Sequence, residues 1–290
     1  MSGPVIAAPV ISWFGAHQRD LPWRRPGFTA WGTLVSEFML QQTPVVRVIP
    51  RLREWLERWP APADLAAEPV GEAIRAWASL GYPRRAMWLH ACAGDIVDRH
   101  GGVVPSDVAE LLALPGIGAY TARAVAVFAY GRRHPVVDTN IRRVIARAVA
   151  GREHPAPPRT RTDLAAMEAL LPDDDAAARL FTAGLMELGA VVCTARSAHC
   201  EVCPIRNSCV WRAAGYPDYN GPKRPTQRSY QGSDRQVRGL VLAVLRGARD
   251  PIPRGDLDRL WPDATQTDRA LAGLVADGLA VHTALGYRLP

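Results

Sequence analysis

The segment from residue 111 to 143 constrains the fold of this chain more than any other. It predicts a helix, a tight turn with the sequence LPGIG at 114–118, and a second helix over 119–130. Pro115 ends the first helix because it has no amide donor, and the two glycines of the turn permit close backbone approach. The free amides that begin the second helix, together with the helix dipole, predict a site for an anion.

An ordinary pair of antiparallel helices joined by a glycine turn would give the same pattern. The segment 136–140, VVDTN, favours the anion-binding interpretation. It follows the second helix as a loop and carries a single carboxylate, Asp138, to the start of a further helix. We therefore expect a functional site in which this carboxylate takes part.

A second acidic residue lies in an unusual setting. The segment 30–42, AWGTLVSEFMLQQ, has apolar residues at helical spacing, and Glu37 lies among them. Burying a charged carboxylate is costly, so we expect a raised pKa that favours the neutral acid. The alternative is a solvated glutamate on the outer face of the helix, which is the usual position of a lone glutamate.

Four of the five cysteines fall between residues 193 and 209, separated by six, two and five residues. Four thiolates around one compact loop suit a 4Fe-4S cluster or a structural zinc, and the cysteines are too clustered for a disulfide framework. The fifth, Cys92, lies in a predicted helix and is expected to be a small buried apolar side chain.

The charge of the chain, +7 at pH 7, suits a polyanionic partner. Residues 141–161 contain six arginines and only one glutamate. A GC-rich genome that prefers arginine over lysine would explain part of this excess. The sequence contains no apolar run of membrane-spanning length and no basic leader at its start, so we expect a cytoplasmic protein. We assume that it is a monomer.

Together these segments resemble the helix-hairpin-helix DNA glycosylase superfamily that includes endonuclease III. SEFMLQQT at 36–43 is similar to the MutY signature SEVMLQQT, so the resemblance is closest to the MutY branch of adenine glycosylases. It covers about residues 20–215. It implies a mainly α fold, with a six-helix barrel at 21–130 and an iron–sulfur cluster domain formed by 1–20 and 131–215.

The resemblance also assigns the chemistry. It makes Glu37 the general acid that protonates the departing adenine, and Asp138 the group that stabilises the oxocarbenium ion or forms a transient covalent link. Asn140 would orient Asp138, and Tyr120 would lie beside the sugar. Bifunctional relatives place a Schiff-base lysine at the position of Tyr120, so base excision without efficient strand cleavage is expected.

Further residues are expected to bind double-stranded DNA that carries adenine opposite 8-oxoguanine or guanine. The hairpin would hold a phosphate through its backbone, and a second group would recognise the bases after adenine has rotated out of the duplex. The predicted hairpin residues are Leu114, Gly116 and Gly118, and the predicted recognition residues are Arg24, Leu40, Gln42, Thr43 and Tyr82. By the same resemblance, Cys193, Cys200, Cys203 and Cys209 would hold one 4Fe-4S cluster.

The end of the chain departs from the family pattern. Residues 216–232 form a basic, proline- and glycine-rich linker, and residues 233–290 predict a small winged-helix-like unit of three helices and a hairpin. The MutY pattern has a C-terminal domain that resembles a nucleotide hydrolase and helps to read 8-oxoguanine. The last sixty residues leave no room for it, so we expect looser discrimination of the opposite base.

Two other functions fit parts of the sequence. One is a different glycosylase of this fold, acting on mismatched thymine or oxidised pyrimidines. The other is a non-catalytic iron–sulfur regulator that binds DNA. The QQT context of Glu37 disfavours the first alternative, and a regulator would not need both Glu37 and Asp138.

Overall fold

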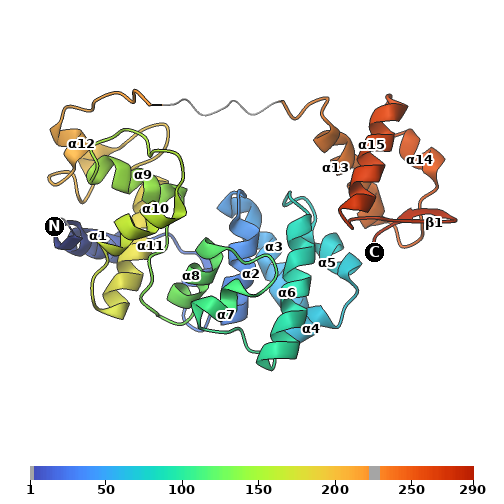
Figure 1. Ribbon diagram of the computed structural model, residues 1–290, viewed down its shortest axis with the longest axis horizontal. Helices are drawn as coiled ribbons and strands as arrows, with labels where there is room; N and C mark the ends of the chain where they lie inside the picture. Colours follow the sequence, from blue (N-terminus) through green and yellow to red (C-terminus); the bar gives the residue numbers. More distant parts are fainter. Residues whose placement is uncertain (1–2, 222–228) are drawn as a thin grey trace. The chain divides into compact units, whose positions relative to one another are not determined.

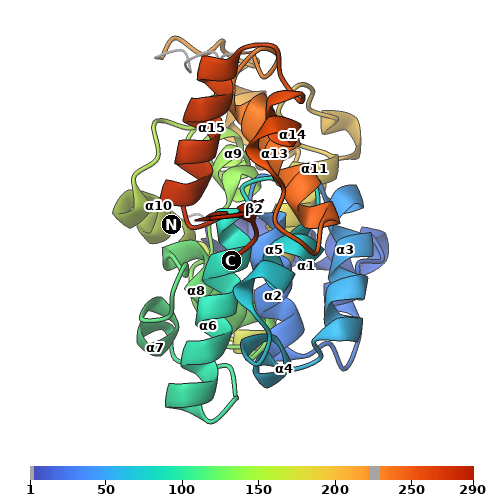
Figure 2. The same ribbon diagram turned by 90° about the vertical axis from the view of Figure 1, so that its right-hand side faces the viewer.

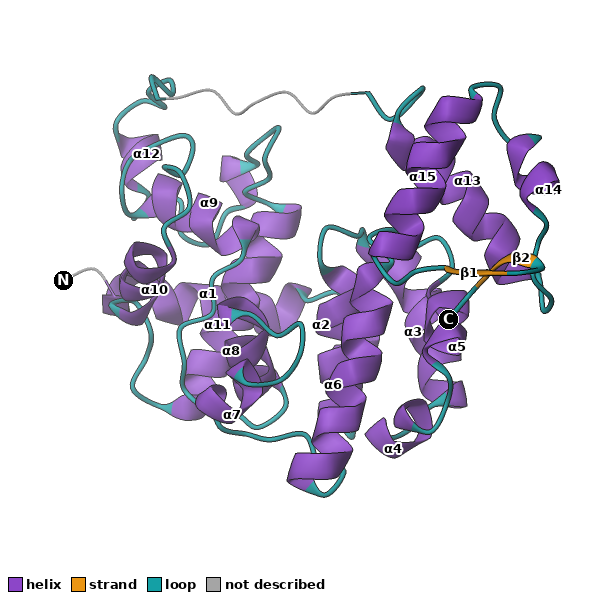
Figure 3. Cartoon of the chain, turned by 45° about the vertical axis from the view of Figure 1, so that its right-hand side comes forward, coloured by secondary structure: helices purple, strands orange, loops and turns teal. Residues whose placement is uncertain are grey.

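The structure is a computed structural model that describes residues 3–221 and 229–290, and most of them are helical (Figures 1 and 3). The chain divides into two compact units. One consists of Met1–Leu34, Ser106–Ala113 and Ile117–Lys223, and the other of Val35–Pro105, Leu114–Gly116 and Arg224–Pro290. Within the described ranges, the helices all lack the combination of length and apolarity that crossing a bilayer requires.

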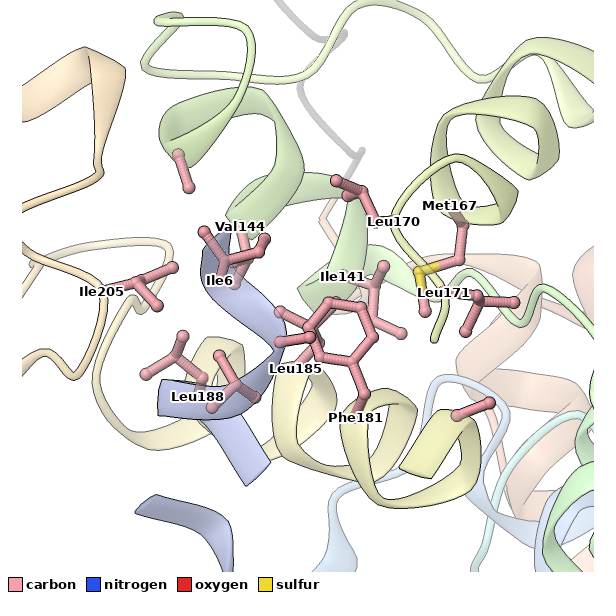
Figure 4. Close-up of a cluster of buried hydrophobic side chains, with 14 of the residues drawn as sticks. Ile6, Ile141, Val144, Met167, Leu170, Leu171, Phe181, Leu185, Leu188 and Ile205 are labelled. Atoms are coloured by element: carbon pink, nitrogen blue, oxygen red, sulfur yellow. The ribbon is translucent and has the colours of Figure 1, made fainter. Parts of the chain in front are cut away.

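The core of the first unit lies where three helices meet. Helix α11, Asp175–Val191, packs along α1, Gly3–His17, and against α9, Thr139–Ala148. Apolar residues of α11 recur every three or four positions, so they share one face. Figure 4 shows Phe181, Leu185 and Leu188 from this face beside Ile6 and Ile141. Burying one such side chain contributes about 1.5–3 kcal/mol.

The rest of the first unit consists of short helices. Asp174 caps α11 by accepting a hydrogen bond from the amide of Ala177 at 2.8 Å. The remaining elements are η1 Pro22–Arg24, α7 Val108–Leu112, α8 Ala119–Phe128, α10 Thr160–Glu168, η2 Cys200–Val202 and α12 Val210–Ala213.

The second unit contains α3 Val45–Arg58, α4 Pro62–Ala66, α5 Val70–Trp77 and α6 Arg84–His100. Its core includes three buried tryptophans in edge-to-face pairs, with ring centroids 4.6 Å apart for Trp55 and Trp59 and 5.7 Å apart for Trp55 and Trp77. Helix α2, Ala30–Leu40, spans the boundary between the two units. Cys92 is fully buried in α6, as predicted, and burial raises the pKa of its thiol to about 12.

The C-terminal part of the second unit contains the three helices and the hairpin that the sequence predicted. It consists of α13 Asp234–Gly247, α14 Arg254–Asp258, α15 Ala264–Ala276 and the antiparallel strands β1 Val281–Thr283 and β2 Gly286–Arg288 (Figure 2). Ile252 adds a second short pairing, with β2, since its amide and that of Tyr287 donate to each other's carbonyls at 2.8 and 2.9 Å. Helices α13 and α15 pack side by side over a core of leucines and valines.

Several boundaries differ from the sequence prediction. Helix α2 ends at Leu40 rather than at residue 42, because Gln42 has a left-handed backbone (φ 54°) and Pro44 disfavours helix at the residue before it. Helices α4 and α5 were not predicted. The predicted linker at 216–232 lies partly outside the described residues, since 222–228 are not described.

Candidate active site

Asp138 is held at the start of α9 by two hydrogen bonds. One carboxylate oxygen accepts from the amide of Ile141 at 2.7 Å, as an N-cap, and the other accepts from the side-chain amide of Asn140 at 2.7 Å. Desolvation raises the pKa of Asp138 above its usual 3.8, although both of these donors act in the opposite direction. The result is a carboxylate of fixed orientation whose affinity for a proton is increased.

Arg143 extends this arrangement to the cysteine-rich loop. Its guanidinium donates to the Asn140 side-chain oxygen at 2.7 Å, to the Gly189 carbonyl at 2.6 Å and to the Cys193 carbonyl at 2.7 Å. Asp138 and the first predicted metal ligand, Cys193, are therefore joined through two intervening side chains. The predicted orienting role of Asn140 agrees with this geometry.

Gly189 allows α11 to approach α9 at Asn140. A Cβ atom at Gly189 would lie 2.7 Å from the Asn140 Cβ and 2.9 Å from its carbonyl oxygen, which is closer than real atoms pack. Only glycine permits this spacing without moving a backbone. The position of Asn140, and through it that of Asp138, thus depends on the absence of a side chain on α11.

Glu37 lies on α2 and is 7% exposed, so the structure excludes a fully solvated position on the outer face. The next residue, Phe38, packs its ring against the hairpin turn, where a Cβ added to Gly116 would lie 3.1 Å from the ring and 2.6 Å from the Trp88 Cβ. Gly116 also has φ 75°, so both packing and backbone conformation require glycine there.

The hairpin has the predicted form. Asp107 is the N-cap of α7. Gly118 is the N-cap of α8 and offers no side chain to cap the following amides. Leu114 is buried and Gly118 is exposed. Tyr120, in the first turn of α8, packs against a small cluster that includes Val136.

Three predicted recognition residues meet in the second unit. The Tyr82 hydroxyl donates to the Gln42 side-chain oxygen at 2.7 Å, and the Thr43 hydroxyl donates to the Leu80 carbonyl at 3.2 Å. Tyr82 is 53% exposed and Gln42 is exposed, so both can reach a ligand. Leu40 lies just before this group and is partly buried.

Arg24 lies elsewhere, in the first unit. It donates to Glu187 at 2.9 Å and to the Arg19 carbonyl at 3.1 Å. Two guanidinium nitrogens of Arg19 donate to the same carboxylate, each at 2.8 Å. The Glu187 side chain is fully buried. These partners hold the pKa of Glu187 at about 2, against the cost of desolvation. The predicted recognition role of Arg24 stays a prediction.

The four clustered cysteines line one pocket of the first unit, which fits the sharing of a common ligand. Arg147, which is buried, donates to the Cys193 sulfur at 3.3 Å and to the Thr194 carbonyl at 2.8 Å, and its guanidinium lies 4.9 Å from the centre of the Trp211 ring. A donor aimed at sulfur stabilises thiolate. In the described residues, no three side chains of His, Cys, Asp or Glu form a group that could hold a single metal ion.

The structure therefore brings together Asp138 with Asn140, and Gln42 with Tyr82 and Thr43. Sequence reasoning missed Arg143, which donates to Asn140, and Arg85, which donates to the Thr43 hydroxyl at 3.2 Å. It also missed the buried carboxylate of Glu187. Glu187 carries the signal that identified Glu37, since it is a single glutamate in an apolar helical segment. The arginines gave no comparable signal among 35 basic residues.

Comparison with known proteins identifies the family of this chain. The family model for HhH-GPD superfamily base excision DNA repair protein matches residues 35–168. An adenine DNA glycosylase of Mycolicibacterium smegmatis is 56% identical over 278 residues, which cover 96% of this chain and 93% of that protein. One from Mycobacterium tuberculosis is 52% identical over 283 residues, which cover 97% and 92%.

Among solved structures, a thermostable thymine-DNA glycosylase shares the fold, with a TM-score of 0.67 at 27% identity over 73% of this chain and 97% of that chain. The two mycobacterial matches leave about 12 and 7 of the 290 residues of this chain uncovered, so they include most of residues 233–290. The chain belongs to the MutY-like family of adenine DNA glycosylases, within the helix-hairpin-helix superfamily.

Proposed function

We propose that this chain removes adenine opposite 8-oxoguanine or guanine from double-stranded DNA, as a monomeric enzyme of base excision repair in the cytoplasm. The near full-length similarity to proteins named adenine DNA glycosylase supports adenine as the leaving base. The observation that carries the mechanism is the setting of Asp138, whose two oxygens are both fixed by donors. Stabilising the positive charge that develops on the sugar requires a carboxylate of fixed orientation.

The reaction needs an acid and a carboxylate. Adenine leaves poorly as an anion, so Glu37 protonates a ring nitrogen as the bond to deoxyribose breaks. The burial of Glu37 fits this role, since it sets the carboxyl apart from bulk water. Asp138 stabilises the positive charge that grows on the sugar, electrostatically or through a transient covalent link. Water then supplies hydroxide to the sugar carbon, and its proton restores the acid.

The enzyme releases the base without efficient strand cleavage. Tyr120 occupies the position at which bifunctional relatives have a lysine, and tyrosine cannot form an imine with the opened sugar. The sequence contains a single lysine, Lys223. The product is therefore an abasic site in an intact strand.

DNA contacts divide between backbone and bases. The uncapped start of α8 after Gly118 supports phosphate binding through backbone amides. Gln42 fills the gap left by the rotated adenine, and Gln42, Thr43 and Tyr82 contact the opposite base. Their clustering in one unit supports this assignment. Arg24 and Leu40 complete the set.

Four cysteines, Cys193, Cys200, Cys203 and Cys209, hold one 4Fe-4S cluster. Their common pocket and the guanidinium donor of Arg147 beside Cys193 fit such a group, because hydrogen bonds to sulfur stabilise cluster thiolates. When bound, the cluster supplies thiolate–iron bonds that hold the loop in place. Through Arg143, that loop supports the position of Asn140 and Asp138.

One assay tests the assignment. The protein is incubated with duplexes that carry adenine opposite 8-oxoguanine, adenine opposite guanine, or thymine opposite guanine, and the strands are then treated with alkali. We expect breaks at adenine only, and mainly after alkali. Release of thymine with no release of adenine would instead identify a thymine-mismatch enzyme of the same fold.

A further inference from the structure

We propose that Arg85 is a positioning residue that fixes the two loops carrying Gln42 and Tyr82 and thereby sets the discrimination of the base opposite adenine. The inference rests on the proposed function, which places these two side chains against the opposite base. Arg85 lies in the first turn of α6, three residues after Tyr82, and is only 3% exposed.

The first loop is held through the end of α2. Arg85 Nη1 donates to the carbonyls of Phe38 at 2.7 Å, Met39 at 3.3 Å and Gln41 at 2.6 Å. The last carbonyls of a helix have no partners within it, so one guanidinium here satisfies several of them and opposes the negative end of the helix dipole. The end of α2, just before Gln42, is fixed as a consequence.

The second loop is held by the other nitrogen of the same guanidinium. Arg85 Nη2 donates to the Gly81 carbonyl at 3.0 Å and to the Thr43 hydroxyl at 3.2 Å. The guanidinium also lies over the Tyr82 ring, 5.4 Å from its centre. The planar fork of arginine can reach both loops at once, which a single ammonium group cannot do.

Both loops contain a strained residue at the point where Arg85 binds. Gln42 has φ 54° and Tyr82 has φ 47°, in the left-handed region that residues other than glycine rarely adopt. The carbonyls of Gln41 and Gly81, which Arg85 binds, belong to the peptide bonds immediately before these two residues. Such conformations persist only where the surroundings hold them in place, and they are common at binding sites.

The position is costly for a cation. Burial lowers the pKa of Arg85 to about 10, and its Nε has no hydrogen-bond partner among the described residues. The described hydrogen-bond partners of its side chain are backbone carbonyls and one hydroxyl. Among the described residues, no carboxylate forms an ion pair with Arg85. A buried cation without a carboxylate is expensive. The hydrogen bonds of Arg85 instead hold the backbone next to Gln42 and Tyr82.

Arg246 offers a matched control in the same unit. It is also a largely buried arginine, its pKa is also lowered to about 10 by burial, and its Nε donates to the Ile74 carbonyl at 3.1 Å. None of its described hydrogen bonds reaches the loops of Gln42 and Tyr82. Arg246→Met therefore removes a comparable buried cation without changing any contact to the loops of Gln42 and Tyr82.

The test compares the wild-type chain of residues 1–290, with its cluster bound, with Arg85→Met, Arg85→Lys and Arg246→Met under single-turnover conditions. Adenine is placed opposite 8-oxoguanine, opposite guanine, or opposite a stable abasic analogue. We expect Arg85→Met to lower the rate opposite 8-oxoguanine by about 10- to 100-fold, since small misplacements of positioning groups have effects of this size. The rate opposite the abasic analogue stays at the wild-type level, because no base is read there.

Arg85→Lys keeps the charge and loses the fork, so it should also lose the preference for 8-oxoguanine. Arg246→Met should change the three rates by a common factor. An equal loss on all three duplexes with Arg85→Met would show a structural role alone and overturn the proposal, as would full activity of Arg85→Lys.

Equilibrium binding separates this inference from the proposed function. The same proteins are titrated with uncleavable duplexes that carry an abasic analogue opposite 8-oxoguanine or guanine. If the wild type releases no adenine, the proposed function fails, and the binding preference still decides the role of Arg85. A preference lost in Arg85→Met and kept in Arg246→Met supports the role. An unchanged preference in Arg85→Met contradicts it.

Discussion

The buried carboxylate of Glu187 provides a quantitative test of how the first unit is held together. Its side chain is fully buried, and it accepts hydrogen bonds from Arg19 and Arg24 at 2.8–2.9 Å. The pKa of Glu187 falls from 4.5 to about 2, a difference of about 2.5. At about 1.4 kcal/mol for each pKa unit, this corresponds to about 3 to 4 kcal/mol of folding free energy at neutral pH.

Glu187→Gln keeps the shape and removes the charge. We expect a loss of about 3 to 4 kcal/mol in the free energy of unfolding at pH 7, and a decrease of about 6–16 °C in the melting temperature. Because the folded pKa lies below the unfolded value, the contribution is complete above about pH 4.5 and is lost as pH falls toward about 2. The difference between wild type and variant should therefore shrink below pH 4.5.

Urea denaturation monitored by circular dichroism between pH 3 and pH 8 measures this difference. Glu54 is the control, because its pair with Arg51 is exposed on α3 and such pairs contribute at most about 1 kcal/mol. Glu54→Gln should therefore cost little at any pH. A Glu187→Gln variant as stable as Glu54→Gln at pH 7, or a difference that persists unchanged at pH 3, would refute the reasoning.

Three further outcomes follow from the site. Gly189→Ala should displace Asn140 and lower single-turnover excision by at least about tenfold, whereas Gly15→Ala, which has open space around it in α1, should leave the rate unchanged. Asn140→Ala removes a donor that lowers the pKa of Asp138, so the acid limb of the pH–rate profile should move to higher pH, and an unchanged limb would contradict the orienting role. Cys203→Ser should reduce bound iron, as measured by elemental analysis and by the visible charge-transfer absorbance. Full iron content in that variant would exclude Cys203 as a ligand.

The local signals in the sequence predicted much of the fold. The LPGIG turn, the helical periodicity and the C-terminal hairpin depend on neighbouring residues, and the structure contains all of them. The N-cap position of Asp138 is also local, because the carboxylate and the amide of Ile141 are three residues apart. The full extent of α2 could not be predicted from periodicity, since its end is set by the left-handed Gln42.

Long-range partners were harder to predict. Glu37 and Glu187 have similar apolar contexts in the sequence, and only the fold shows that two arginines more than 160 residues away bind Glu187. Arg85 donates to backbone carbonyls more than 40 residues away in the sequence. Every residue has a backbone carbonyl, so the sequence does not indicate which carbonyls an arginine will bind. A residue that acts by holding the backbone is therefore visible only in the structure.

The central claim is that an acid at position 37 and a carboxylate at position 138 together release adenine. Single-turnover excision from a duplex with adenine opposite 8-oxoguanine tests it most directly, with the wild type compared with Glu37→Gln and Asp138→Asn. We predict that each variant binds the duplex and loses at least about 100-fold in rate, the usual effect of removing a general acid or a charge-stabilising group. Wild-type rates in Glu37→Gln or in Asp138→Asn would contradict the account.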